Sequence, residues 1–329
     1  MSLMFFPIRG GIAVLLSCFL LAATPASAAD PWPNRPLRVI LPYGAGGSYD
    51  VIARVVSSRL ADQIGQPVIV DNRPGAAGRI AMELAVKSPA DGYVLVVIGN
   101  SQTIVPSVHV KVPYDLARDL DYVSMVATVA NALLVNPGVP AQTIGEFVAL
   151  SRAKPGTIRF GSGGAGSSGH LACELIRSMT GADLTHIPYK GAAPAVTALL
   201  GNEVQMYVSN LVNAVPQIQA GRVRALAVTG LQRSPMLPGV PTLDETVAKG
   251  YEFVEFHGMA MPRGIPSAII ARLNHEIDKA LGSAELRVRF SAQGAEASPS
   301  TPQAFGRLVL AEQAKYAKIV RAIGLKPED

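Results

Sequence analysis

The sequence predicts an α/β protein of two lobes, each with a mostly parallel sheet flanked by helices. Three observations support this prediction. The chain of 329 residues is long enough for about two domains of ordinary size. Hydrophobic residues make up 49% of it and charged residues 16%, so it can bury a sizeable core. A unit of strand, glycine-rich loop and helix also occurs twice.

The first copy of this unit begins with residues 37–43 (LRVILPY), a short β-branched run that predicts a strand ending at a glycine-rich loop. Apolar residues at helical spacing then predict a helix over 50–63, which Gly65 ends. The pattern continues with a strand at 67–70, a loop at 72–78, a helix at 79–87 and a strand at 93–98. This β-α-β-α-β order is half of a doubly wound parallel sheet.

The second copy repeats the order, with a strand at 157–160, a glycine loop at 161–169 (GSGGAGSSG) and a helix at 170–179 that Gly181 ends. It continues with a strand at 184–187, a loop at 188–192, a helix at 195–200 and a strand at 204–208. After it come a strand at 223–229 and amphipathic helices at 267–281 and 302–323.

Two similar units imply two lobes. Because the C-terminal part is expected to pack on the first lobe, that lobe is discontinuous and comprises residues 29–125 and 230–329. The second lobe comprises residues 126–229. The connections near 123–135 and 224–230 would then form a hinge.

The N-terminus has the features of a secretory signal. Arg9 is the only charged residue before Asp30, and residues 11–23 form an apolar run. Residues 26–28 (ASA) then offer small side chains at the positions that a signal peptidase reads. We therefore expect residues 1–28 to be removed and the mature chain to be exported.

Two other interpretations of the N-terminus fit less well. A membrane-spanning helix needs about 20 apolar residues, and Thr24-Pro25 interrupts the run too early. Lipidation at Cys18 remains the alternative, but the apolar run continues past this cysteine instead of giving way to a polar tether. After cleavage Cys173 is the only thiol, which excludes an internal disulfide. Since Cys173 lies in a helical pattern, we expect a buried structural thiol rather than a nucleophile.

Charge and motifs exclude several function classes. The net charge of +5 is dispersed, which argues against a nucleic-acid partner. Residues 161–166 match G-x-G-x-x-G, but the strand at 184–188 lacks the acidic end that a dinucleotide site needs, so we expect no cofactor. Ser167, Ser168 and His170 are too close on one helix start to act as nucleophile and base, and no G-x-S-x-G elbow is present. The five histidines show no metal-ligand spacing, so we expect no metal.

Each glycine loop lies between a strand and its helix, at the sheet edge where open α/β sheets bind ligands. Helix N-termini present unpaired N–H groups and a positive dipole end, so they favour anions. Two such edges facing across a cleft would clamp a carboxylate. The alternative is that the glycines only make tight turns. Ser167 or Ser168 would cap the helix and bind the anion. Asp50 would cap its own helix or, alternatively, hold an amino group of the ligand.

Several stretches resemble the Bug family, the periplasmic substrate-binding components related to tripartite tricarboxylate transporters. They cover nearly the whole mature chain in the order and spacing of that family. The matching stretches are 42–50 (PYGAGGSYD), 70–78 (VDNRPGAAG), 161–175, 188–192 (PYKGA), 224–229 (RALAVT) and 237–242 (LPGVPT).

The resemblance implies a two-lobed periplasmic-binding-protein fold, or Venus flytrap, that closes on a small carboxylate largely through main-chain N–H groups and bridging waters. It implies cradles at 43–48 and 163–170, with added side-chain donors at 99–103. The ligand-binding residues so expected are Tyr43, Ala45, Gly46, Gly47, Ser48, Asp50, Asn100, Ser101, Gly163, Ala165, Gly166, Ser167, Ser168, His170, Ser209 and Asn210.

Two positions depart from the family pattern. The family often has Pro-Phe-x-x-Gly-Gly where this chain has Tyr43 and Gly44. It also often carries an Asp, suited to a cationic amino group, where Ser209 stands here. We therefore expect a plain organic acid, such as a di- or tricarboxylate or an aromatic acid, rather than an amino acid.

The expected function is that of a monomeric, non-catalytic solute-binding protein in the periplasm, which delivers its acid to the membrane permease subunits of a tripartite transporter. Two alternatives remain open. One is a sensor subunit that presents the ligand to a signalling receptor, and the other is an exported enzyme on the same scaffold.

Overall fold

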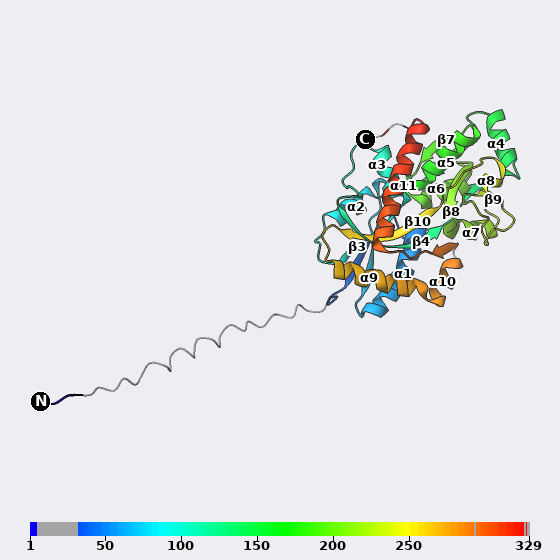
Figure 1. Ribbon diagram of the computed structural model, residues 1–329. Coiled ribbons are helices and arrows are strands. Elements are labelled where there is room, and N and C mark those ends of the chain that lie inside the picture. The colour runs from blue at the N-terminus through cyan, green and yellow to red at the C-terminus, as the bar shows by residue number, and fades with distance from the viewer. Residues whose placement is uncertain (5–31, 293, 326, 328–329) are drawn as a thin grey trace.

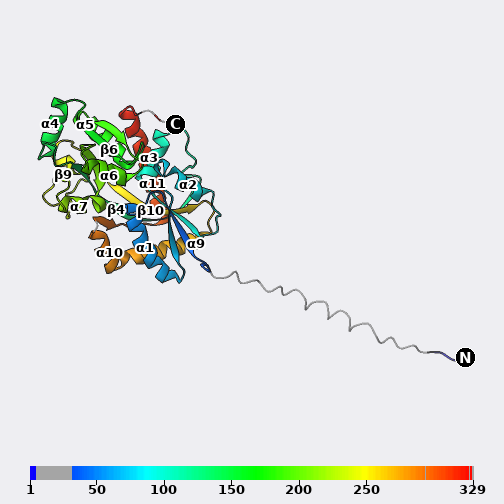
Figure 2. The same cartoon turned by 180° about the vertical axis from the view of Figure 1, so that it is seen from behind.

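Two β-sheets, each covered by helices, make up the part of the chain that this computed structural model describes, residues 1–4, 32–292, 294–325 and 327 (Figures 1 and 2). Beyond its first four residues, the predicted signal peptide lies outside the described residues. The same holds for its cleavage site after Ala28 and for the alternative lipidation site, Cys18.

The first sheet has six strands in the order β11-β4-β10-β3-β1-β2. Strands β1, β2 and β3 are parallel, whereas β10 runs antiparallel to both β3 and β4. The strands are β1 (Leu37–Leu41), β2 (Val68–Asn72), β3 (Val94–Gly99), β4 (Leu120–Val129), β10 (Glu255–Pro262) and β11 (Ala295–Ala297). The helices around it are α1 (Ser48–Ile64), α2 (Arg79–Val86), α3 (Asn100–Val108), α9 (Ser267–Gly282), α10 (Ala284–Ser291) and α11 (Pro302–Ala322), with a short 3-10 turn at Ala76–Gly78.

The second sheet has five strands in the order β7-β6-β8-β5-β9. Strands β6, β7 and β8 are parallel, and β5 runs antiparallel to β8 and β9. The strands are β5 (Asn131–Val135), β6 (Arg159–Ser162), β7 (Thr185–Pro188), β8 (Met206–Asn210) and β9 (Arg224–Val228). The helices are α4 (Ile144–Ala153), α5 (Ser168–Thr180), α6 (Ala192–Leu200), α7 (Leu211–Gln219) and α8 (Leu243–Thr246).

The two sheets repeat one plan. The order β2-β1-β3 in the first corresponds to β7-β6-β8 in the second, and each continues with an antiparallel strand, β10 or β5. The predicted α/β class with two helix-covered sheets is therefore confirmed. Each sheet is mixed, since β10 and β11 in the first sheet and β5 in the second form antiparallel pairs.

Several element boundaries differ from the prediction. Strand β6 takes in Gly161 and Ser162, which the sequence pattern placed in the glycine loop. Gly161 pairs there with Ile187 and Tyr207, so sheet pairing outweighs the low strand propensity of glycine. Helix α5 also begins two residues early, at Ser168, because Ser167 caps it.

The chain passes between the sheets at a joint held by Asn131, Thr229 and Phe253. Strand β4 runs into β5 through Ala130, and β9 leads through residues 230–254 into β10. At the joint, the Thr229 amide donates to the Asn131 carbonyl (3.0 Å), and its hydroxyl donates to the Phe253 carbonyl (2.7 Å). The Phe253 amide donates back to the Thr229 carbonyl (2.8 Å). These bonds bring the crossing segments together at one place, while the exact division into lobes stays a prediction.

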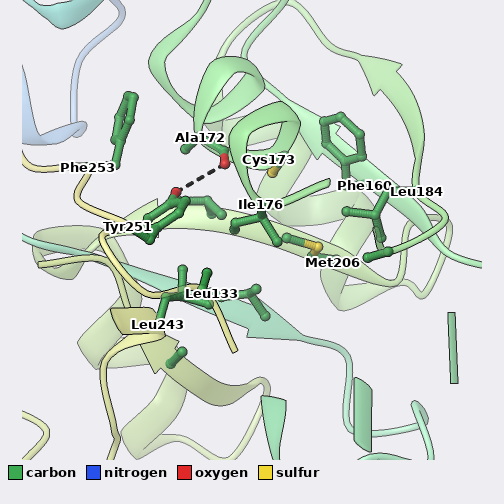
Figure 3. Packing of buried hydrophobic residues seen from close by; sticks show 14 of the residues in the cluster. Leu133, Phe160, Ala172, Cys173, Ile176, Leu184, Met206, Leu243, Tyr251 and Phe253 are labelled. Atoms are coloured by element: carbon green, nitrogen blue, oxygen red, sulfur yellow. Dashed lines mark hydrogen bonds between the residues drawn. The ribbon is translucent and has the colours of Figure 1, made fainter. Parts of the chain in front are cut away.

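The core of the second sheet includes residues from the returning segment (Figure 3). Tyr251 and Phe253 lie against Ile176 and its neighbours on α5, and the Tyr251 hydroxyl donates to the Ala172 carbonyl (3.0 Å). Cys173 is fully buried in this cluster, as its helical pattern predicted, and burial raises the pKa of its thiol. Residues 243–253 therefore pack on the second sheet before the chain enters β10.

A stacked pair of histidines lies behind the second glycine loop. The rings of His170 on α5 and His186 on β7 are 3.9 Å apart and nearly parallel. His186 also lies 2.6 Å from the Ser162 hydroxyl. Burial lowers the pKa of His170 to about 3 and that of His186 to about 4. Both rings are therefore neutral in the folded protein at neutral pH.

This pair predicts a specific loss of stability in acid. In the unfolded chain both histidines bind protons as the pH falls below about 6.5, whereas the folded state resists protonation. Stability should thus be complete above about pH 7 and fall progressively toward pH 4. Urea unfolding at several pH values should show a shallower decline for His186→Asn than for wild type. The matched control, His275→Gln at an exposed position on α9, should keep the wild-type decline. Equal slopes for His186→Asn and wild type would refute this origin.

Candidate functional site

Helix N-termini from both sheets meet where the sheets face each other. Helices α1 and α5 follow β1 and β6 through the two glycine loops, whereas α3 and α7 begin directly after β3 and β8. In the first sheet β1 lies between β2 and β3, so the chain leaves β1 toward one neighbour and leaves β2 for the neighbour on the other side. In the second sheet β6 lies between β7 and β8 in the same way. Such points of divergence are where open α/β sheets bind ligands.

The first glycine loop is held in shape by Asp50. Gly46 has a φ of +85°, and its amide donates to the Asp50 carboxylate (3.1 Å). Arg54 Nε (2.9 Å) and Asn72 Nδ2 (3.0 Å) donate to the same carboxylate. Burial alone would raise the pKa of Asp50, but the hydrogen bonds from Arg54, Gly46 and Asn72 hold it below its usual value. Asp50 therefore lies in the first turn of α1 and stiffens the loop, and its carboxylate is committed to these donors.

The start of α1 keeps free donors. Gly47 is its N-cap and provides no side chain, and the first hydrogen bond of the helix runs from Val51 to the Gly47 carbonyl. Within the described residues, the amides of Ser48 and Tyr49 donate to no protein acceptor. Unpaired donors at the positive end of a helix are suited to an anion.

The second glycine loop uses more of its donors internally. The Gly164 amide donates to the Ser162 hydroxyl (3.1 Å), and the Gly166 amide donates to His170 Nδ1 (3.2 Å). The Ser167 hydroxyl caps α5 by accepting the His170 amide (3.3 Å). His170 and Ser167 thus shape this loop from within, and both are buried.

Two direct contacts join the loops of the two sheets. The Ser168 amide donates to the Ser101 hydroxyl at the start of α3 (3.2 Å). The Asn210 side chain, which caps α7, donates to the Ser48 hydroxyl at the start of α1 (2.9 Å). Gly166 fits so closely against α3 that an added Cβ would lie 2.5 Å from Val108 Cγ2. The helix starts of the two sheets are therefore in direct contact here.

A buried carboxylate, Glu255, lies at the centre of these contacts. It is the first residue of β10 and is 5% exposed. The Ser168 hydroxyl donates a short hydrogen bond to it, and Asn210 Nδ2 lies 3.5 Å from its second oxygen. The sequence analysis missed Glu255, although one acidic residue within the apolar run 253–261 (FVEFHGMAM) is an informative signal.

Aromatic rings line the same region. The Tyr43 and Tyr49 rings are 4.8 Å apart, and Tyr49 stacks on His257 at 4.1 Å. Burial raises the pKa of Tyr43 to about 12, and the negative charge of Glu255 adds to this effect. Burial raises the pKa of Tyr207 as well, again with a contribution from Glu255.

The remaining residues of the predicted site lie in different settings. Asn100 is fully buried, donates to the Val254 carbonyl (2.9 Å) and accepts the Phe256 amide (2.9 Å), so it ties α3 to β10. Ser209 is buried in β8, and its hydroxyl donates to the Asn210 carbonyl (3.3 Å). Three others, Ala45, Gly163 and Ala165, lie at partly or fully exposed positions of the loops. The structure thus brings Ser48, Ser101, Ser168 and Asn210 together, and it gives Asp50, Asn100, Ser167 and His170 protein partners.

Among the described residues, no group of three or more His, Cys, Asp or Glu side chains is placed to hold a metal ion. None of the helices in the described ranges is both long and apolar enough to cross a membrane.

Comparisons with known proteins agree with this architecture. The model of the tripartite tricarboxylate transporter family receptor matches residues 52–325. Protein BugT of Bordetella pertussis is 39% identical over 309 residues, which are 92% of this chain and 94% of the relative.

Two solved structures with bound acids superpose closely. R. palustris Rpa4515 with adipate has a TM-score of 0.87 and 34% identity, covering 90% of this chain and 100% of its own. MatC from Rhodopseudomonas palustris with bound malate has a TM-score of 0.82 and 28% identity, covering 88% of this chain and 99% of its own. The fold and the family are those of solute-binding proteins. The chain belongs to the tripartite tricarboxylate transporter receptor family, to which its Bug-like motifs pointed.

Proposed function

We propose that this protein captures a small carboxylic acid between its two lobes in the periplasm and delivers it to a membrane permease. One observation carries the proposal. The N-terminus of α1 has free N–H groups at Ser48 and Tyr49, and its Ser48 hydroxyl meets Asn210 at the cap of α7 in the second sheet. The similar proteins with bound adipate and malate support the same ligand class.

Backbone donors, rather than a cationic side chain, would hold the acid. Neither residues 43–49 nor residues 161–170 contain Lys or Arg. The nearby Arg54 pairs with Asp50, and Arg73 pairs with Asp71 (3.0 Å). A hydrogen bond to a charged group contributes roughly 1.5–3 kcal/mol. A few of them, offset by the entropy lost on binding, give about −8 kcal/mol, or micromolar affinity.

The remaining parts of the proposal concern the mature chain. Residues 1–28 would be cleaved, so that a soluble monomer begins at Ala29, and N-terminal sequencing of the exported protein would check this. Lobes of 29–125 plus 230–329 and of 126–229 would move about the joint at Thr229. The partner would be the permease of a tripartite transporter, and no step of the proposal includes catalysis.

The most direct test is native mass spectrometry of protein purified from the periplasm. A carboxylic acid should be recovered bound and chemically unchanged. Recovery of a converted product would indicate an enzyme instead. If the purified protein also binds no mono-, di- or tricarboxylate in calorimetry, the proposed ligand class is wrong.

The two sheets should approach each other fully only because residue 166 is a glycine and has no Cβ. In Gly166→Ala, the new Cβ would push against Val108 of α3, and calorimetry with the recovered acid should show at least about tenfold weaker binding. Gly65→Ala is the matched control, since Gly65 also has a positive φ (+69°) but its Cβ would meet nothing within 4 Å. Equal affinities for the two variants would show that the contact with Val108 is not needed.

Ligand binding should also reduce the size of the molecule. The contacts of Ser168 with Ser101 and of Asn210 with Ser48 are available only when the two sheets approach each other. Small-angle scattering should therefore give a smaller radius of gyration with saturating acid than without it. An unchanged radius would contradict a hinge-closing mechanism.

A further inference from the structure

We propose that Glu255 selects a carboxylic acid that also carries a positively charged nitrogen, which pairs with Glu255 in the closed cleft. The inference rests on the proposed function, because it assumes that the cleft binds a carboxylate. It adds a residue that determines specificity and a second chemical group on the ligand.

Glu255 lacks a cationic side chain as its partner among the described residues. Its carboxylate is 5% exposed and accepts hydrogen bonds from uncharged groups of Ser168 and Asn210. Among the residues that the structure describes, no lysine or arginine forms an ion pair with it. A buried charge without a partner is strongly unfavourable, so the site is complete only when a cation joins it.

His257 does not supply that cation in the observed geometry. Its Nε2 lies 3.7 Å from the Glu255 carboxylate, which is longer than a hydrogen bond. Its ring stacks on Tyr49, and neither of its nitrogens has a hydrogen-bond partner in the described part of the chain. His257 therefore lies beside Glu255 and leaves the lone pairs of the carboxylate available to a ligand.

Tyrosine side chains lie near the Glu255 carboxylate. Tyr43, Tyr49 and Tyr207 all lie close enough to Glu255 for its charge to contribute to their raised pKa values. The faces of aromatic rings attract cations, so tyrosines around a carboxylate favour a positively charged group over a second anion. The Tyr49 hydroxyl is itself buried without a partner and adds an unused polar group.

Glu255 lies close to the start of α1, where the amides of Ser48 and Tyr49 are free. Asn210 contacts both the Ser48 hydroxyl at the start of α1 and the Glu255 carboxylate, so the two sites share one side chain. A ligand carboxylate at the amides of Ser48 and Tyr49 would place an amino group within reach of Glu255. The sequence analysis expected a plain acid because Ser209 carries no charge after β8. Glu255 supplies a negative charge to the cleft from β10 instead.

The test compares acids that differ only in an amino group. Calorimetry on the wild-type protein would use malate against aspartate and adipate against 2-aminoadipate. In at least one pair the aminated acid should bind about tenfold more tightly or better, as expected for a charged hydrogen bond.

Variants then assign the preference to Glu255. Glu255→Gln keeps the size of the side chain and removes its charge, so the preference for the aminated acid should disappear or reverse. Glu255→Asp keeps the charge and should retain the preference. Glu252→Gln is the matched control, because it removes the same charge from an exposed neighbour, and it should behave as wild type.

The outcomes distinguish a failure of the role of Glu255 from a failure of the proposed carboxylate-binding function. If the plain acid of each pair binds as tightly as its aminated partner in the wild type, the role of Glu255 is wrong while the proposed function stands. If neither acid of any pair binds, and no other carboxylate does, the proposed function fails and the inference fails with it. If Glu255→Gln does not fold, the wild-type comparison and Glu255→Asp still decide the question.

Discussion

The closed form depends on hydrogen bonds from helix starts to one buried carboxylate. Ser168 at the start of α5 and Asn210 at the cap of α7 both reach Glu255, which belongs to the other sheet. These helices direct their positive dipole ends toward it, which offsets part of the burial of a negative charge. In the proposed complex, a ligand carboxylate at the amides of Ser48 and Tyr49 would lie beside these helix starts and near the negative charge of Glu255.

The hydrogen bonds from Ser168 and Asn210 to Glu255 form only when the two sheets are close together, and the chain crosses between the sheets at the joint near Thr229. Asn131 begins β5, Thr229 directly follows β9, and Phe253 lies two residues before β10. A rotation at this joint would separate Ser168 and Asn210 from Glu255 while leaving each sheet intact. Asp50 and His170 support the shapes of the first and second glycine loops through hydrogen bonds from Gly46 and Gly166. In the proposed mechanism, binding and closure would be coupled through the few bonds between the sheets, those of Ser168 and Asn210 to Glu255.

Much of the fold could be predicted from local sequence signals. The repeated strands, glycine loops and helices, with Gly65 and Gly181 as helix ends, follow from spacing and turn chemistry. The family resemblance placed Ser48 in the ligand cradle and the start of the second helix suggested Ser168, and their role in binding stays a prediction. Glu255 was missed because its importance comes from long-range contacts, which a strand pattern does not show. Asp50 was expected to cap its helix, and the structure shows it bonded to the Gly46 amide. The family resemblance placed Asn100 and His170 in the site, and only the structure shows that their polar groups bind other protein atoms.

The central claim is that backbone amides at α1 bind the ligand carboxylate while Glu255 binds its positive group. A crystal structure of the protein with its native ligand tests this claim most directly. It should show a carboxylate oxygen about 3 Å from the amide nitrogen of Ser48 or Tyr49, and a ligand nitrogen about 3 Å from the Glu255 carboxylate. A ligand carboxylate paired with a lysine or arginine side chain, or a ligand with no group facing Glu255, would contradict it.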